Sequence, residues 1–310
     1  MKRLSLDHLT QALARTLAHH LPGLLLLMTA LLTTPAIAAS GATTAPAPPS
    51  ANPGASDSVT TLPDGRLLAP DIARIVARGE LVVATLNSDR PPFLEEVDGQ
   101  PEGLEVELVR KLARALQVSL RFNREAGTFN EVIDRVARQE ADIGISKLSR
   151  TLGRAQTVRF SDPYLRLNHA MILNRIAFAR LAEGRTLQAV IRDFQGSIGV
   201  IDMSSYAEFA RLNFPRATIR SFPSWEEVLA AVRSGEVVAA YRDEFEIKRI
   251  LKEDPSSSLT LRTVTFKDLE DPLCIAVGFG DSVLLAFINQ FLSERHNRLS
   301  LEMALDAIRP

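Results

Sequence analysis

A dense group of polar side chains occupies the stretch from Ser146 to Tyr164, which reads SKLSRTLGRAQTVRFSDPY. Ser149 and Thr151 supply hydroxyl groups in its first half, and Arg154 supplies a guanidinium. A guanidinium presents parallel N–H donors that match a carboxylate, and neighbouring hydroxyls can add further donors. The residue types and their spacing therefore predict a site that grips a small anion. A surface ion pair with a nearby acid is the alternative role for Arg154.

Signatures of catalysis and of metal binding are missing from the sequence. It contains no HExxH, no phosphate-binding loop ending in Gly-Lys-Ser/Thr, no GxGxxG and no GxSxG. Beyond residue 38 the histidines are His169 and His296, which leaves little material for a metal cluster or a Ser/His/Asp triad. His169 begins a predicted strand, where we expect a structural role. We therefore expect no cofactor, no metal site and no catalytic residue.

Composition indicates a globular protein that does not bind nucleic acid. The 310 residues are 46% hydrophobic and carry a formal net charge of -1, with arginines and glutamates interspersed. Cys274 is the single cysteine and lies in the apolar run DPLCIAVGF, so we expect it to be buried and no intrachain disulfide to form. The length is sufficient for two lobes with separate cores.

The first 38 residues have the pattern of a secretory signal peptide. A positively charged start is followed by an apolar core over Leu21–Thr34, and then by the small residues Ala36–Ala38. We expect cleavage after Ala38 and a periplasmic location. An uncleaved membrane anchor is the alternative, because the charge-free run is about long enough for the ~20 residues that cross a bilayer.

A flexible linker is expected over residues 39–66. Residues 39–58 read ASGATTAPAPPSANPGASDS, with almost no charge and no large apolar side chain. Such a segment buries too little surface to offset the entropy lost on ordering it, so it should act as a tether.

From residue 67 onward, strand patterns and helix patterns alternate. Short apolar or alternating runs predict strands at 80–86, 118–123, 141–146, 169–175, 197–201, 217–222, 237–241 and 273–279. Spacings of three and four predict helices at 103–117, 129–139, 204–214, 224–235, 243–254, 281–294 and 300–308. This order predicts an α/β fold whose mainly parallel sheets are flanked by helices. Ligands of such folds bind at the carboxyl ends of the strands.

Six segments, in this order, resemble the periplasmic amino-acid-binding proteins of ABC transporters, which form solute-binding protein family 3. They are GELVVA…PPF, GLEVELVRKLARAL, ADIGISKLSRTLGR, FSDPY, FQGSIGVIDMSSY and GEVVAAYRDEF, and the resemblance covers about three quarters of the chain. It implies a two-lobed type II periplasmic-binding-protein fold. The first lobe would comprise residues 67–167 and 276–310, and the second 168–275. Two crossing segments would form a hinge, and ligand would close the lobes.

The resemblance also implies a ligand site. The position matching Arg154 holds the ligand's α-carboxylate, and the position matching Asp243 takes its α-ammonium. The remaining implied ligand-binding residues are Ser149 beside the arginine, Ser146 one shell further out, Phe93 of the PPF motif, and Ser204 and Ser205 at a helix start. Helix capping is the alternative role for Asp243 and for the two serines at 204 and 205.

Three positions depart from the family pattern. Arg90 replaces the aromatic residue that usually stacks on the ligand, Lys147 replaces the second serine of a Ser-Ser pair, and Met203 replaces a glycine. Two cations, Arg90 and Lys147, beside Arg154 would favour an acidic ligand, either an acidic amino acid or a dicarboxylate without the amine. The alternative is that both long side chains extend into solvent.

The resemblance thus implies an exported, monomeric solute-binding protein rather than an enzyme. It would capture a small carboxylate-bearing solute, such as an amino acid, and deliver it to the membrane subunits of an ABC permease. One alternative is a periplasmic sensing module or the substrate-binding half of a lytic transglycosylase. Another is a small enzyme resembling cyclohexadienyl dehydratase, with Glu244 or Glu208 as acid or base.

Overall fold

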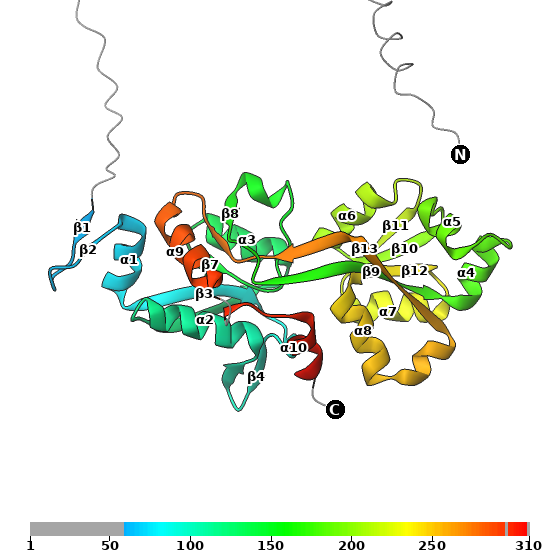
Figure 1. Ribbon diagram of the computed structural model, residues 1–310, viewed down its shortest axis with the longest axis horizontal. Helices are drawn as coiled ribbons and strands as arrows, with labels where there is room; N and C mark the ends of the chain where they lie inside the picture. Colours follow the sequence, from blue (N-terminus) through cyan, green and yellow to red (C-terminus); the bar gives the residue numbers. More distant parts are fainter. Residues whose placement is uncertain (1–58, 295–296, 309–310) are drawn as a thin grey trace, which may run out of the picture. The chain divides into compact units, whose positions relative to one another are not determined.

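Two β-sheets, each covered by helices, form the two lobes of the protein (Figure 1). The computed structural model describes residues 59–294 and 297–308, which all belong to one compact unit, Gly54–Pro310. The predicted signal peptide and residues 39–58 of the predicted linker lie outside the described residues. For residues 59–66 the linker prediction is wrong, because Thr60 and Thr61 pair with Leu67 and Leu68 and the side chain of Leu62 is buried. Across these described ranges, no helix combines the length and apolarity needed to cross a membrane.

The first lobe is built on a five-stranded sheet with the order β6-β3-β7-β14-β8. Strand β3 (Glu80–Leu86) pairs parallel with β6 (Ser119–Ala126) and with β7 (Ile143–Gly144). Strand β14 (Ala276–Gly278) pairs antiparallel with β7 and with β8 (Val158–Phe160). Six successive residues of β3 are buried, as expected of a central strand that is covered on both faces.

Helices from both ends of the described chain cover this sheet. They are α1 (Pro70–Arg78), α2 (Leu104–Ala115), α3 (Phe129–Ala137), α9 (Ser282–Ser293) and α10 (Leu301–Asp306), with a 3-10 turn η2 at Arg154–Gln156. Two small hairpins, β1–β2 (Thr60–Thr61, Leu67–Leu68) and β4–β5 (Glu95–Val97, Gln100–Glu102), lie beside the main sheet. The C-terminal segment therefore returns to complete the first lobe.

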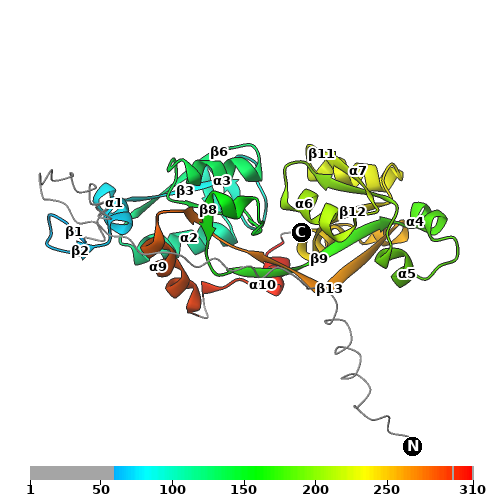
Figure 2. The same cartoon turned by 90° about the horizontal axis from the view of Figure 1, so that it is seen from above.

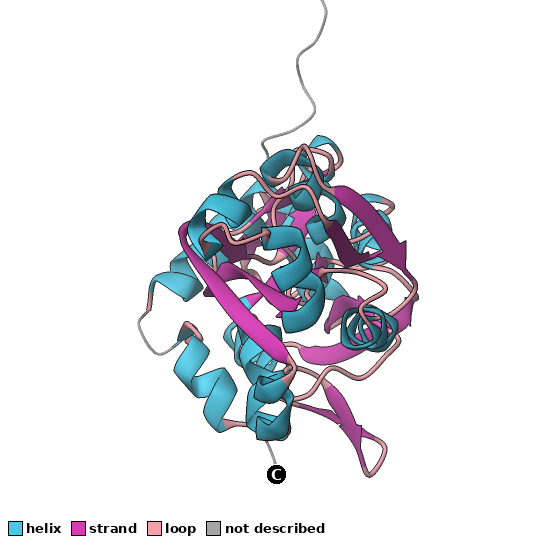
Figure 3. Cartoon of the chain, turned by 90° about the vertical axis from the view of Figure 1, so that its right-hand side faces the viewer, coloured by secondary structure: helices cyan, strands magenta, loops and turns pink. Residues whose placement is uncertain are grey.

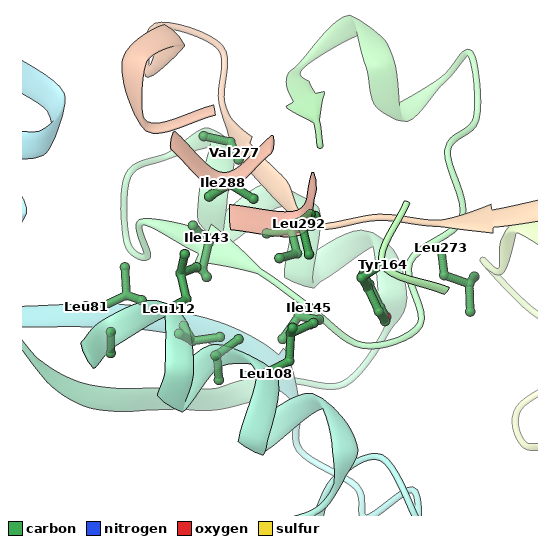
Figure 4. Packing of buried hydrophobic residues seen from close by; sticks show 14 of the residues in the cluster. Leu81, Leu108, Leu112, Ile143, Ile145, Tyr164, Leu273, Val277, Ile288 and Leu292 are labelled. Carbon is green, nitrogen blue, oxygen red and sulfur yellow. The ribbon is translucent and has the colours of Figure 1, made fainter. Parts of the chain in front are cut away.

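Packing in the first lobe joins segments that are far apart in sequence. In Figure 4, Leu108 and Leu112 of α2 lie near Ile143 of β7, while Ile288 of α9 belongs to the same cluster. Each of these side chains is at most 3% exposed. The leucine spacing of four along α2, which the sequence pattern predicts as one helix face, is the face that packs on the sheet.

The second lobe has a sheet of the order β11-β10-β12-β9-β13. Strand β10 (Ser197–Ile201) pairs parallel with β11 (Thr218–Phe222) and β12 (Ala239–Asp243), while β9 (Leu165–Asn174) pairs antiparallel with β12 and β13 (Leu261–Leu273). Its helices, labelled in Figure 1, are α4 (Arg175–Ala182), α5 (Leu187–Arg192), α6 (Ser205–Asn213), α7 (Trp225–Ser234) and α8 (Glu244–Glu253), followed by a 3-10 turn η3 (Pro255–Leu259). Figure 3 shows the molecule from the side of this lobe.

Strands β9 and β13 cross between the lobes, as Figure 2 shows. Along β9, Leu165 belongs to the core of the first lobe and Met171 to a core of the second. Along β13, Leu273 belongs to the first core and Leu261 to the second lobe. Two strands with a shared ladder connect the sheets, which is the two-strand hinge that the resemblance implies.

The expected fold class is confirmed, with one refinement in the sheets. Each sheet is mixed rather than mainly parallel, because the returning strands β9, β13 and β14 add antiparallel pairs. The predicted helix over residues 224–235 is confirmed as α7. The Ser224 hydroxyl caps its start by accepting a hydrogen bond from the Glu227 amide, and Gly235 ends it with a φ of 82°. Cys274 is buried and free, as expected.

Candidate functional site

Two adjoining cavities lie where the lobes meet, and both are bordered by Ser204 and Ser205 at the start of α6. The outer cavity measures ≈ 590 Å³ and lies between α6 and the first-lobe segment that carries Thr151 and Arg154. The inner cavity measures only ≈ 20 Å³ and is bordered by side chains from both lobes, among them Lys147 and Asp243. A small solute therefore has room in the outer cavity, whereas the inner one is filled by the protein itself.

Arg154 borders the outer cavity from the first lobe and is held in place by neutral acceptors. Its Nε donates to Oδ1 of Asn130 at 3.1 Å, and its Nη1 donates to the carbonyl of Ser149 at 3.0 Å. Among the described residues it forms no ion pair, so the surface-pair alternative is wrong. Burial lowers its pKa to about 10, which leaves the guanidinium charged at neutral pH. A fixed cation that has no carboxylate within ion-pair distance, although Asp271 and Glu208 act on its charge from further away, is suited to bind an anion beside this cavity.

The start of α6 borders the same cavity from the second lobe. The Ser204 hydroxyl caps the helix by accepting from the Ala207 amide at 3.3 Å, which is the capping role given above as an alternative. The Ser205 hydroxyl donates to Oγ of Ser149 across 2.9 Å and so links the two lobes. The first turn of a helix carries partial positive charge, so this end of α6 adds to the preference for an anion.

Asp271 of β13 lies behind these serines and was not among the residues predicted from the sequence. Its Oδ2 accepts hydrogen bonds from Ser149 Oγ and from the Tyr206 hydroxyl, both at 2.9 Å, while its Oδ1 has no partner. Burial, together with the nearby charge of Asp243, raises its pKa to about 7. A carboxyl group that titrates near neutral pH therefore borders the inner cavity.

Lys147 is paired inside the cleft, contrary to the expectation that it adds free positive charge. Its Nζ lies 2.8 Å from Oε1 of Glu246 and 3.1 Å from Oδ2 of Asp243. The side chain is only 5% exposed, so it does not extend into solvent either. Both expectations for Lys147 are wrong for the same reason: two buried carboxylates of the second lobe, which sequence spacing does not reveal, hold its ammonium.

Asp243 has the capping role given as its alternative, while its contact with a ligand ammonium stays a prediction. Its Oδ1 caps α8 by accepting from the Glu246 amide at 3.0 Å, and its Oδ2 faces Lys147. The Arg242 guanidinium lies alongside, with its Nε 3.7 Å from the same Oδ2. A ligand ammonium would have to compete with Lys147 for this carboxylate.

Arg90 and Arg242 bring two more guanidinium groups to the inner cavity. Arg90 lies 5.0 Å from the centroid of the Phe129 ring, and Arg242 lies 5.0 Å from that of Trp225. Burial, followed by the like charge of Arg242, lowers the pKa of Arg90 to about 10. The Nε of Arg90 and the Nη1 of Arg242 are buried without a hydrogen-bond partner. Arg90 therefore stays within the cleft, as the prediction of an acidic ligand requires.

Ser146 and Phe93 border neither of the two cavities. The Ser146 hydroxyl accepts a hydrogen bond from the Leu86 amide at 3.1 Å, and Phe93 is 1% exposed and packs edge-on against Phe245. The structure gives both a packing role: Ser146 ties β7 to the end of β3, and Phe93 supports the base of the cleft. The place of Ser146 agrees with the expectation that it lies one shell further out, and the predicted role of Phe93 at the ligand stays a prediction.

The two glutamates named as alternative acid or base differ in position. Glu244 is buried and accepts hydrogen bonds from the Asn168 amide and from Lys248, so its oxygens serve structure. Glu208 borders the outer cavity. In the described part of the chain, no cluster of three or more His, Cys, Asp or Glu residues could hold a metal ion.

Two α/β lobes, two crossing strands and cavities where the lobes meet define a class of binding protein. The family of bacterial extracellular solute-binding proteins, family 3, matches residues 81–302. The chain therefore belongs to this family.

Solved structures with a similar fold include amino-acid-binding proteins. The amino acid ABC transporter substrate-binding protein AbpA from Streptococcus pneumoniae, bound to L-arginine, is 25% identical with a TM-score of 0.59, over 76% of this chain and 96% of that one. The ancestral amino acid-binding protein AncCDT-1, a precursor of cyclohexadienyl dehydratase, is 24% identical with a TM-score of 0.58, over 76% of this chain and 96% of that one.

Sequence relatives fall into two kinds. The membrane-bound lytic murein transglycosylase F of Idiomarina loihiensis is 27% identical over 230 residues, which is 72% of this chain and 48% of that enzyme. The ABC transporter glutamine-binding protein GlnH of Bacillus subtilis is 22% identical over 202 residues, which is 63% of this chain and 68% of that protein. The chain spans only 23%, 48% and 34% of the lengths of three transglycosylases of this kind.

Proposed function

We propose that this protein is an exported solute-binding protein that captures a small carboxylate-bearing solute between its two lobes. The observation that carries the proposal is the position of Arg154. Arg154 is 7% exposed, and its guanidinium is fixed by Asn130 and by the Ser149 carbonyl. The residue borders a cavity of ≈ 590 Å³, and no carboxylate of the described residues forms an ion pair with it. The start of α6 lies on the other side of this cavity. One carboxylate could thus contact both lobes and favour their closure.

Delivery to the membrane subunits of an ABC permease is the second half of the proposal. It rests on membership of solute-binding family 3 and on the fold shared with an ABC transporter substrate-binding protein. A periplasmic location and removal of the N-terminal segment follow from the signal-peptide pattern in the sequence. N-terminal sequencing of the exported protein would test the latter, with a first residue of Ala39 as the expected result.

A thermal-shift screen tests the capture of a carboxylate. Wild-type protein would be screened against amino acids, dicarboxylates and aromatic acids, since a ligand at 100 times its dissociation constant adds about 2.7 kcal/mol of stability. Arg154→Ala should lose the shift that the best ligand produces. Arg159→Ala is the matched control, because Arg159 is exposed on β8 and borders neither cavity. An unchanged shift in Arg154→Ala would contradict the assignment of the site.

A lyase of the same fold is the second candidate, and Asp271 is the observation that favours it. A carboxyl group with a pKa of about 7 inside a cleft is suited to transfer protons at neutral pH. Elimination of water from a bound carboxylate would need such a group close to the leaving hydroxyl, so the solute would have to reach past the outer cavity to Asp271, which borders the inner one. Product analysis after prolonged incubation with the ligand identified in the screen tests this candidate, with Asp271→Asn as the control. Recovery of unchanged ligand from wild-type protein would contradict the lyase candidate and support only the binding function.

A further inference from the structure

The surroundings of the Lys147 ammonium resemble a binding site for a free amine. Its Nζ contacts carboxylate oxygens of Asp243 and Glu246 at 3.1 and 2.8 Å. It also lies 4.9 Å from the ring centroid of Phe93 and 4.8 Å from that of Phe245. Two carboxylates and two aromatic faces around one ammonium form a set that would attract a ligand cation if the lysine were absent.

The backbone of Lys147 is arranged so that its side chain enters the second lobe. The residue has a φ of 49°, in the left-handed region that non-glycine residues seldom adopt. Its amide donates to Oε1 of Glu105 at 2.7 Å, which fixes this conformation. A non-glycine residue held in the left-handed region at a cleft is often part of how the site works.

No space for a second cation remains at this position. The inner cavity of ≈ 20 Å³ has room for about one water molecule, because a cavity must offer roughly 10–15 Å³ to hold one. An α-ammonium with its carbon would not fit unless Lys147 moved out. The outer cavity beside Arg154, in contrast, is open.

The charged groups around the inner cavity are largely paired with one another. Lys147, Arg242 and Arg249 all contact Glu246 within 4.0 Å. Lys147 and Arg242 also contact Asp243, and Arg249 also contacts Glu253, while Asp271 borders the same cavity. Unpartnered buried donors remain on Arg90 and Arg242, and one unpartnered acceptor remains on Asp271. Because Lys147 already occupies Asp243 and Glu246, a zwitterion would bring a positive charge that these two carboxylates could bind only by releasing the lysine.

We propose that Lys147 is a tethered cation that permanently fills the amine position of the cleft, so that the solute is a carboxylate without an amino group. The class of solute rests on the proposed function, whereas the position of Lys147 does not. Dicarboxylates and hydroxy- or keto-acids belong to this class, and α-amino acids do not.

Chemical rescue tests the tethered cation without any knowledge of the solute. Lys147→Ala removes the ammonium that pairs with the buried carboxylates of Asp243 and Glu246. The melting temperature should therefore fall by roughly 5 °C or more. Propylammonium ions at tens of millimolar should restore most of this loss, whereas sodium or tetramethylammonium at equal ionic strength should not. Lys248→Ala is the matched control, because Lys248 pairs with Glu244 near the surface and should show no specific rescue. A loss without selective rescue would overturn the proposal.

A measurement on the unaltered protein covers the case in which Lys147→Ala does not fold. Reductive methylation with formaldehyde would be followed by mass spectrometry of the lysine-containing peptides. Lys147 should stay unmodified under conditions that dimethylate Lys111 and Lys267, which are both exposed. Equal modification of Lys147 would show that its ammonium is free and would overturn the proposal.

Calorimetry with pairs of acids that differ only in the amine tests the solute class. Wild-type protein should bind succinate at least about tenfold tighter than aspartate, and glutarate tighter than glutamate, a difference of about 1.4 kcal/mol or more. Lys147→Ala should reduce or reverse this preference. Tighter binding of the amino acids by wild-type protein would overturn the inference and leave the proposed capture function standing. Selective rescue without binding of any carboxylate would support the tethered cation and contradict the proposed function.

Discussion

Tyr206 donates its hydroxyl hydrogen bond to Oδ2 of Asp271 across 2.9 Å, and so joins helix α6 to the crossing strand β13. The same oxygen accepts from Ser149 of the first lobe, at 2.9 Å. One carboxylate thereby ties together both lobes and the hinge. Its protonation state should therefore influence the stability of the protein.

Asp271→Asn should change the pH dependence of stability. The carboxyl has a pKa of about 7 in the folded protein, against 3.8 as its ordinary value, so folding favours the protonated form. Wild-type stability should consequently fall as the pH rises from about 4 through 7. Between pH 5 and pH 8, wild type should lose roughly 2–3 kcal/mol more than the Asn variant, measured by urea unfolding. Parallel pH profiles of the two proteins would show that Asp271 is ionised throughout.

His169→Gln should change how the free energy of unfolding depends on pH below about 6.5. His169 is 4% exposed beside Tyr206 and Tyr241, and burial lowers its pKa to about 4. The unfolded chain takes up a proton near pH 6.5 and the folded protein does not, so wild-type stability should fall as the pH drops from 6.5 towards 4. The Gln variant should lose roughly 2–3 kcal/mol less over this range. A wild-type profile no steeper than that of the variant would indicate that His169 is protonated in the folded state.

Gly103→Ala should destabilise the first lobe strongly. Gly103 precedes α2 with a φ of 125°, and an added Cβ would lie 2.4 Å from the carbonyl oxygen of Phe93. Because backbone would have to move, the expected loss is about 3 kcal/mol or more in the free energy of unfolding. Gly280→Ala is the control, since nothing lies within 4 Å of its added Cβ, and it should change stability by less than about 1 kcal/mol. Similar effects of the two substitutions would argue against the tight approach at Gly103.

Much of the fold could be predicted because its elements carry local signals. Strand β3 coincides with the apolar run Glu80–Leu86, and α7 has a serine cap and a terminal glycine. Strand β13 was not predicted, because LRTVTFKDLEDPL mixes charged residues and a proline with its apolar positions. Asp271 was missed together with this strand, since an aspartate before Pro272 reads as a turn.

The site could be predicted only in part, because pairing inside the cleft depends on contacts between distant segments. Arg154 and Ser149 lie together as their spacing suggests. The partners of Lys147 lie on α8 and at its start, about a hundred positions along the chain, and no sequence pattern links them. The charge of a cleft is set by such pairs rather than by the count of its basic residues.

Isothermal titration of Arg154→Ala with the tightest-binding carboxylate tests the central claim most directly. Loss of a charge-assisted contact in a closed cleft costs roughly 2–5 kcal/mol, so affinity should fall by about 30-fold or more relative to wild type. Arg159→Ala should bind as wild type does, and unfolding by urea should show that both variants remain folded. Equal affinity of Arg154→Ala and wild type would contradict the claim that this guanidinium holds the carboxylate of the solute.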